Sequence, residues 1–313
     1  MINVSMIFPG QGLQKPCHLI NLNQYNHIIK NTFYEASEYL KNNMWNMIKN
    51  KNNVNKKHHQ YIQSITFISS VALYRFWIKI SGIKPIIASG HSLGEYSALV
   101  CSNAIKFSDA IKLVHKRELM MNKQSLKNKL QMNMIVGLEK KKILNICKKY
   151  SKNKIVNIAA INTNKQIVIS GHKKSVENTI IACKKMGAKY TIKLPISIAA
   201  HCSIMKKIRR NLSKKLKKIN IKNTQYPIIS STSTTQYKSK HTIRKSLIEQ
   251  LFKPVQWEKT MKFIISKSDI ILEVGTNDFL TRTYKKKNNK KFISINSIKN
   301  INYILQLLNN HYD

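Results

Sequence analysis

The turn Gly90-His91-Ser92-Leu93-Gly94 decides the fold, because an apolar run at residues 85–89 precedes it and a helix-like run at residues 95–104 follows it. This arrangement predicts a strand, a tight turn and a helix. G-x-S-x-G in that setting is typical of a turn that presents a nucleophilic serine. The helix start would direct free N–H groups at developing negative charge, which makes Ser92 the expected nucleophile and the Leu93 N–H an expected oxyanion donor. The alternative is an ordinary glycine-rich turn with a capping serine.

A serine nucleophile needs a base, and the chain has ten histidines that could supply it. His201 is the leading candidate, because it follows the apolar segment 196–200 and lies where the chain is expected to return to the main sheet. The residues alone leave the other histidines open, and His91 is expected to point away from the reacting side. A backbone carbonyl could hold the second ring nitrogen of His201. No sequence feature marks any of the four aspartates as its partner: Asp109, Asp269, Asp278 and Asp313.

Two further residues are candidates for binding. The alternating apolar residues 2–8 predict a first strand, and Gln11 lies in the glycine-bounded loop that follows. Its N–H could approach Ser92 as a second oxyanion donor, although ordinary turn chemistry explains Gln11 equally well. Arg117 lies on a predicted amphipathic helix that leaves the nucleophile region. A buried arginine can bind a carboxylate through two hydrogen bonds, whereas the alternative is a surface basic residue.

The middle of the chain has a different pattern of expected strands and helices. Residues 132–138, 154–162, 166–170 and 189–196 are predicted strands, and residues 139–150 and 173–186 are predicted helices. The order βαββαβ is that of a ferredoxin-like unit. Because this unit lies between the Ser92 and His201 segments, we interpret it as an insertion. We therefore expect a discontinuous core at 1–127 and 198–313, with a small subdomain at 128–197.

The charge of the chain is strongly positive, at +42 from 55 Lys+Arg and 13 Asp+Glu. Taken alone, this favours a basic nucleic-acid-binding protein, which is the hypothesis from another functional class. Only six of the basic residues are arginine, the residue expected for bidentate phosphate and base contacts. Lys, Asn and Ile are spread along the whole chain, so we favour compositional drift. A basic surface would still attract anionic partners.

The remaining composition favours a cytoplasmic protein. Five cysteines without C-x-x-C spacing indicate reduced thiols. The first twelve residues lack the apolar core of a signal peptide, and no apolar run reaches about 18 residues, so no membrane span is expected.

The combination of motifs resembles the malonyl-CoA:acyl-carrier-protein transacylases of bacterial type II fatty-acid synthesis. The resemblance follows the chain in order over about residues 3–283. It is carried by the segments 8–12, 70–75, 90–99, 166–173, 250–257 and 273–275.

The resemblance implies an α/β fold, with an α/β-hydrolase-like core around a parallel sheet and an inserted ferredoxin-like subdomain. It implies malonyl-CoA and acyl carrier protein as partners, and no metal or redox cofactor. We further expect a cytoplasmic monomer that binds neither nucleic acid nor a membrane. Its implied site comprises the nucleophile Ser92, the base His201, the oxyanion donors Gln11 and Leu93, the malonyl-carboxylate ligand Arg117, the pocket residue Gln63, and Gln250, whose main-chain carbonyl orients the histidine.

Some positions depart from the family pattern without removing an expected catalytic residue. Asn128 and Leu130 lie where glycines are frequent, Ala200 replaces a common serine, and Thr276 begins a segment where Pro-Gly is usual. These departures are expected to alter loop shape and acyl selectivity. Within the enzyme class, the alternative functions are a serine hydrolase and a transferase for another acyl group.

Overall fold

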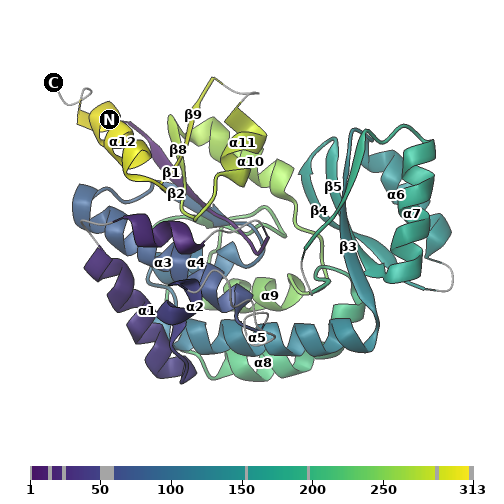
Figure 1. Ribbon diagram of the computed structural model, residues 1–313, viewed down its shortest axis with the longest axis horizontal. Helices are drawn as coiled ribbons and strands as arrows, with labels where there is room; N and C mark the ends of the chain where they lie inside the picture. The colour runs from purple at the N-terminus through teal and green to yellow at the C-terminus, as the bar shows by residue number, and fades with distance from the viewer. Residues whose placement is uncertain are drawn as a thin grey trace.

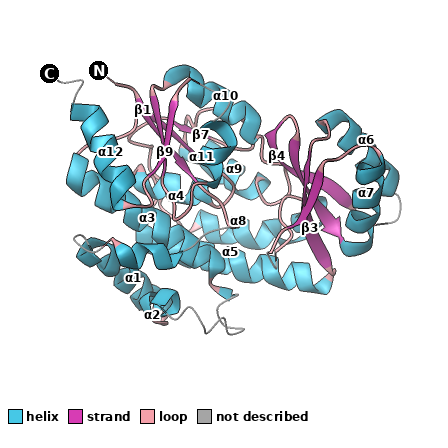
Figure 2. Ribbon diagram, turned by 45° about the horizontal axis from the view of Figure 1, so that its top comes forward, coloured by secondary structure: helices cyan, strands magenta, loops and turns pink. Residues whose placement is uncertain are grey.

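Two sheets, one parallel and one antiparallel, organise the chain into a larger and a smaller lobe (Figure 1). The computed structural model describes residues 2–12, 16–22, 26–49, 60–151, 154–195, 198–285 and 289–309. Figure 2 shows the two sheets side by side, each with its own helices packed against it. The expected α/β class is thereby confirmed.

The sheet of the larger lobe is parallel throughout, in the order β7-β2-β1-β8-β9. Its central strands are fully buried and apolar, as expected for a parallel sheet covered by helices. The predicted first strand is its central strand. The strands are β1 (Val4–Phe8), β2 (Ile87–Gly90), β7 (Ile228–Ile229), β8 (Ile270–Glu273) and β9 (Lys291–Ser294).

Helices surround this sheet, and three of them carry residues of the site. The almost entirely buried α3 (Ile62–Ser81) packs against both α4 (Gly94–Cys101) and the long α5 (Phe107–Lys127). The other helices of the larger lobe are η1 (Pro16–Asn21), α1 (Asn26–Leu40), α2 (Met44–Lys49), η4 (Ser203–Ile208), α8 (Arg209–Lys217), α9 (Lys240–Glu249), α10 (Trp257–Lys267), α11 (Phe279–Lys285) and α12 (Ile298–Asn309). No helix in the described ranges is long and apolar enough to cross a membrane.

The smaller lobe contains the antiparallel sheet, in the order β4-β5-β3-β6, and a separate hydrophobic core that includes Ile135, Ile143 and Val176. Its order of strands and helices matches the prediction, with shifted bounds. The first strand ends before Gly137, whose φ of +94° starts a turn, and the last ends at Lys193, while Ile196 lies outside the described residues. The elements are β3 (Leu130–Val136), α6 (Lys140–Tyr150), β4 (Val156–Thr163), β5 (Gln166–His172), α7 (Lys173–Lys185) and β6 (Tyr190–Lys193).

The two lobes meet along β4. Ala160 forms an isolated parallel bridge with Val255, where the Ile161 N–H donates to the Val255 carbonyl at 2.8 Å. The Tyr284 hydroxyl of α11 donates to the Asn162 carbonyl. The long helix α5 runs from the larger lobe directly into β3 (Figure 1). These contacts place the antiparallel sheet beside the carboxyl ends of β1 and β2, where the site lies.

Candidate active site

The nucleophile turn joins β2 to α4 and is held against the end of β1. The His91 N–H donates to the Phe8 carbonyl at 2.8 Å. A Cβ on Gly94 would lie 2.1 Å from that same carbonyl oxygen, so only glycine allows the close approach. Ser92 has a φ of 54°, a strained left-handed conformation for a non-glycine residue. Ser92 lines the same cavity as Met132, Ala160 and Val168 of the smaller lobe.

His201 is the candidate base for the serine. Its Nε2 lies 2.7 Å from the Ser92 Oγ, and its own φ is 60°. Its Nδ1 lies 3.2 Å from the Lys253 carbonyl, and its N–H donates to the Leu251 carbonyl at 2.9 Å. A carbonyl can only accept a hydrogen bond, so Nδ1 carries the proton and Nε2 presents its lone pair to the serine.

From the sequence, the main-chain carbonyl of Gln250 is expected to orient the His201 ring. His201 Nδ1 donates to the carbonyl of Lys253, three residues further on. The main chain of Gln250 also interacts with His201, and both backbone groups oppose the lowering of its pKa. The segment 250–253 as a whole therefore orients the ring, which a single residue match could not specify.

The His201 ring is neutral at physiological pH. Burial, with smaller contributions from the nearby charge of Arg117 and from the His91 ring, lowers its pKa to about 3. A neutral imidazole can accept the Ser92 proton, so the site is in the protonation state that nucleophilic attack requires.

Two N–H groups are candidates for an oxyanion hole. The Leu93 N–H lies at the start of α4, where the helix dipole favours negative charge. Gly10 lies against the nucleophile turn so closely that a Cβ on it would be 2.8 Å from the His91 carbonyl oxygen and 3.6 Å from the Ser92 Cβ. The glycine therefore brings the backbone of Gln11 next to the serine.

Arg117 is the cation of the site. Its side chain is 1% exposed, lies over the Tyr96 ring at 5.5 Å, and lines the same cavity as Ser92 and His201. Burial lowers its pKa, which the nearby Glu118 and Glu95 charges partly oppose. Within the described residues its Nε has no hydrogen-bond partner. The surface-residue alternative from the sequence analysis is wrong.

Two glutamine amides hold the guanidinium. The Gln63 Oε1 accepts a short hydrogen bond from Arg117 Nη1, and the Gln250 Oε1 accepts from Nη2 at 3.3 Å. The Gln63 Nε2 in turn donates to the Gln11 Oε1 at 3.1 Å. Neutral amides position the cation without neutralising it, so it can still pair with a carboxylate.

Sequence reasoning missed two buried acids around this network. Glu118 accepts hydrogen bonds from the Gln63 N–H at 2.8 Å and from Ser64, and so fixes the start of α3. Burial raises its pKa to about 8. Glu95 holds the Gln250 amide. Both follow or interrupt apolar helical runs in a chain with only 13 acidic residues, and that scarcity was the signal that could have found them.

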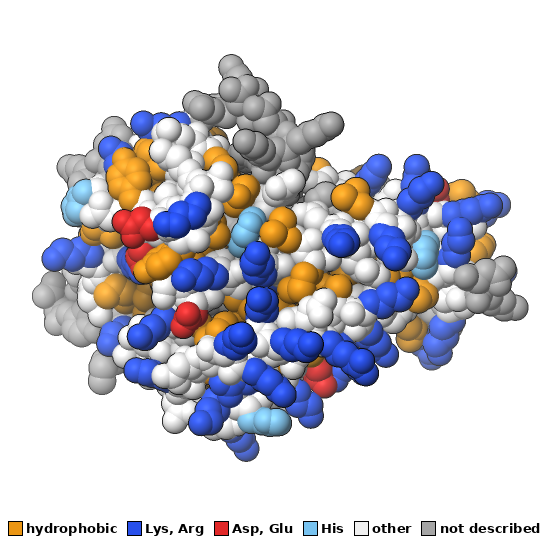
Figure 3. Space-filling view, turned by 90° about the horizontal axis from the view of Figure 1, so that it is seen from below, with side chains coloured by type: hydrophobic (Ala, Val, Ile, Leu, Met, Phe, Trp, Pro, Cys, Tyr) orange, Lys and Arg blue, Asp and Glu red, His pale blue; other side chains and the backbone are white. Residues whose placement is uncertain are grey.

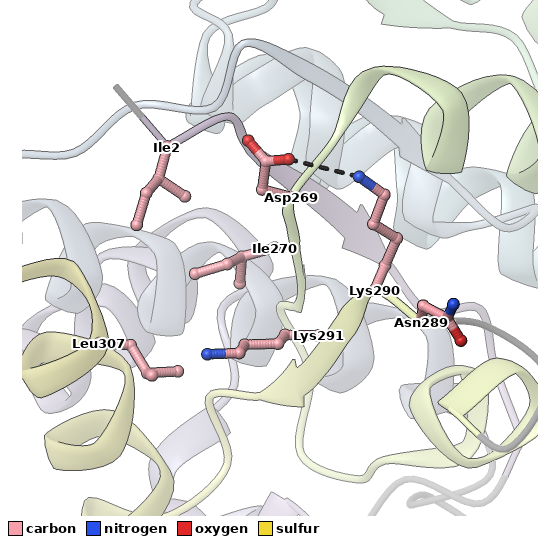
Figure 4. A pocket seen from close by; sticks show the side chains of 7 residues that line it. All are labelled: Ile2, Asp269, Ile270, Asn289, Lys290, Lys291 and Leu307. Atoms are coloured by element: carbon pink, nitrogen blue, oxygen red, sulfur yellow. Dashed lines mark hydrogen bonds and ion pairs between the residues drawn. The ribbon is translucent and has the colours of Figure 1, made fainter. Parts of the chain in front are cut away.

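The reacting groups line a small cavity of about 80 Å³ between the lobes. A second cavity of about 170 Å³, lined mainly by apolar side chains that include Ile192 and Phe279, shares Gln11 and His91 with it. A larger hollow of about 470 Å³ lies around Asp269 and Lys290, which form an ion pair at 3.3 Å (Figure 4). It lies at the amino ends of β8 and β9, whereas Ser92 lies at the carboxyl ends of the strands.

The fold and the site define the class of serine-dependent acyl transferases, and the acyl transferase domain family matches residues 5–298. The malonyl CoA-acyl carrier protein transacylase of Buchnera aphidicola subsp. Schizaphis graminum is 42% identical over 302 residues, which cover 96% of this chain and 97% of the relative. The chain belongs to the malonyl CoA-acyl carrier protein transacylase family.

Solved structures agree with this assignment. The transacylase of that name from Coxiella burnetii superposes with a TM-score of 0.93 at 31% identity, covering 97% of each chain. A malonyl-transacylase determined in complex with a type II PKS acyl-carrier protein superposes with a TM-score of 0.92 at 32% identity, covering 97% of this chain and 99% of that one.

Proposed function

We propose that the chain transfers a malonyl group from malonyl-CoA to the pantetheine thiol of acyl carrier protein, in fatty-acid synthesis. The observation that carries the proposal is the cavity shared by the Ser92–His201 pair and the buried cation Arg117. The serine can accept an acyl group, and the buried cation favours an acyl donor that carries a free carboxylate. Malonyl-CoA has both the thioester and that carboxylate.

In the first step, Ser92 attacks the thioester carbonyl while His201 Nε2 takes its proton. The N–H groups of Gln11 and Leu93 would stabilise the oxyanion. Coenzyme A leaves as its thiol, which takes the proton back from His201, and a malonyl ester remains on Ser92. The Lys253 carbonyl stabilises the imidazolium that forms in between, because it accepts from Nδ1.

In the second step, the pantetheine thiol of acyl carrier protein enters the place that coenzyme A has left. His201 takes the thiol proton, the thiolate attacks the ester, and the proton passes to the Ser92 oxygen as it leaves. The two thiols therefore use the same histidine in turn, which gives a ping-pong scheme. The apolar cavity next to Gln11 supports a common path for both pantetheine arms.

Arg117 accounts for selection of a diacid. A malonyl carboxylate would pair with the guanidinium, whereas an acetyl group would leave a buried cation without a counter-charge. Gln63 and Gln250 occupy one N–H of each terminal nitrogen, which leaves further donors of the fork for the carboxylate.

The surface charge supports an acidic carrier protein as partner. Figure 3 shows Lys and Arg side chains distributed over both lobes on one face, with few acidic side chains among them. Such a surface accelerates encounter with an anionic protein and makes the rate sensitive to salt. On this face, the basic side chains do not form the single stripe expected of a nucleic-acid groove.

The finer description of the fold is also part of this proposal. The element order and strand order of the smaller lobe support a ferredoxin-like subdomain at 128–197, and the parallel sheet with its nucleophile turn supports an α/β-hydrolase-like core at 1–127 and 198–313. We propose a cytoplasmic monomer that needs no metal or redox cofactor, because transfer between two thioesters consumes no electrons.

Transfer of radiolabelled malonyl between the two substrates tests the proposal. The purified chain, malonyl-CoA and holo acyl carrier protein should yield malonyl carrier protein, and Ser92→Ala should yield none. Release of free malonate without transfer would indicate a hydrolase, and equal transfer of acetyl would indicate a different acyl specificity. Binding of DNA at physiological salt without acyl loading would favour the nucleic-acid alternative.

A further inference from the structure

Glu95 is a fully buried acid in the first turn of α4, three residues after the nucleophile. Its carboxylate accepts hydrogen bonds from four neutral donors. Two of them bind Oε2, the Ser231 hydroxyl at 2.8 Å and the Gln250 Nε2 at 2.9 Å. The other two bind Oε1, the Ser246 hydroxyl at 3.1 Å and the Tyr237 hydroxyl. A carboxylate with this many donors is rigidly held, and as an acceptor it dictates which groups can face it.

The Gln250 amide is the only one of these donors that also reaches the reacting groups named above. Its Nε2 donates both to Glu95 and to the Ser92 carbonyl at 2.8 Å. Its Oε1 accepts from Arg117 Nη2. Because two acceptors claim the two amide hydrogens, the amide oxygen must face the guanidinium.

We propose that Glu95 is a positioning residue that fixes the orientation of the Gln250 amide and thereby aims Arg117 at the substrate carboxylate. The inference rests on the proposed function, since it concerns the same diacid-binding cation. Without the carboxylate, the amide can turn over and present its NH₂ group to the guanidinium. Two donors would then oppose each other, and the cation would leave its position.

Glu95→Leu tests the role, because it removes both acceptor oxygens at a similar side-chain size, whereas a glutamine would keep one acceptor facing the Gln250 amide. The measurement is the ratio of malonyl to acetyl loading of Ser92 from the two CoA thioesters. Misplacement of Arg117 affects only the malonyl reaction, whereas damage to the Ser92 turn or a loss of folded protein affects both and cancels in the ratio. We expect the ratio to fall at least about tenfold, the effect of losing one hydrogen bond to a charged group.

Two controls separate positioning from general damage. Ser246→Ala removes another donor to the same carboxylate but leaves the Gln250 contact, so its ratio should equal that of the unaltered chain. In the Arg117→Met background, Glu95→Leu should not change the ratio further, because the cation that Glu95 positions is gone. If Glu95→Leu does not fold, Glu95→Asp shortens the reach to Gln250 and should lower the ratio in the same way.

The outcomes distinguish this inference from the proposed function. If the unaltered chain does not load malonyl on Ser92, the proposed function fails. If it loads malonyl preferentially and Glu95→Leu keeps the same ratio, the positioning role alone is overturned. A further fall in the Arg117→Met background would also overturn it, because Glu95 would then act by another route.

Discussion

The Nε2 of His201 lies 2.7 Å from the Oγ of Ser92, although 109 residues separate them in the chain. The whole smaller lobe is contained in that interval. The larger lobe brings the two together, since Ser92 follows β2 and the segment 251–253 holds His201 by its N–H and its ring. The smaller lobe lines the cavity of the pair through Met132, Ala160 and Val168.

His201 should be required for acylation of the serine. We expect His201→Ala to slow the first turnover of malonyl-CoA by about 10²–10⁴-fold, the range for removal of a general base. Rapid-quench measurement of released coenzyme A checks this. The exposed His241 gives a matched control, because His241→Ala should leave the rate unchanged. A normal burst in His201→Ala would assign the base elsewhere.

Arg117 should set the preference for a diacid. Arg117→Met should reduce malonyl loading relative to acetyl loading by about a hundredfold or more, since loss of one partner of a buried charge pair costs about 3 kcal/mol or more. Competition between the two CoA thioesters measures the ratio. Arg75 pairs with Glu35 at 2.6 Å and does not line the Ser92 cavity, so Arg75→Met serves as the control. An unchanged ratio in Arg117→Met would remove the cation from substrate recognition.

The dependence of the acylation rate on pH should be that of a buried histidine base. Because burial lowers the pKa of His201 to about 3, the acylation rate should show no histidine inflection near pH 6.5 and should fall only as pH approaches 3. The Arg117 charge contributes to this lowering, so the acid limb should move to higher pH in Arg117→Met. Stopped-flow rates across the acid range test both statements. A full inflection near 6.5 in the unaltered chain would show a solvated base.

Glu118 should make the folded state less stable as pH rises. Burial raises its pKa from 4.5 to about 8, so between these values the folded state binds a proton that the unfolded state releases. The free energy of unfolding therefore falls with rising pH through this window, by up to about 1.4 kcal/mol per pH unit from this one group. Glu118→Gln removes the contribution and should flatten the profile.

Urea unfolding of the unaltered chain and of Glu118→Gln, measured across the pH range between the two pKa values of Glu118, isolates the effect. Glu273 also has a raised pKa, about 7, and adds a slope of the same sign, but it is present in both chains and cancels in the difference. Parallel profiles would mean that Glu118 titrates near its ordinary pKa.

The parts of this molecule that depend on local sequence could be predicted. The turn at Ser92 was evident from two glycines between an apolar strand and a helix, and the smaller lobe from its alternating strands and amphipathic helices. The structure gives a reason for each glycine, as the 2.1 Å approach at Gly94 illustrates.

The parts that depend on long-range contacts could not be predicted from the residues. The hydrogen bond from His201 to Lys253 spans 52 positions, and that from Gln250 to Glu95 spans 155. No periodicity or spacing encodes which backbone carbonyl will face a ring. The family resemblance identified Gln250 by its main chain, and only the packed structure reveals that its side chain connects the Ser92 carbonyl to Arg117.

The covalent intermediate on Ser92 tests the central claim most directly. Mass spectrometry of the chain after incubation with malonyl-CoA alone should show one malonyl adduct, which peptide mapping places on Ser92. Addition of holo acyl carrier protein should remove the adduct and produce malonyl carrier protein in equal amount. Transfer without an adduct, an adduct on another residue, or an adduct that only water removes would contradict the account.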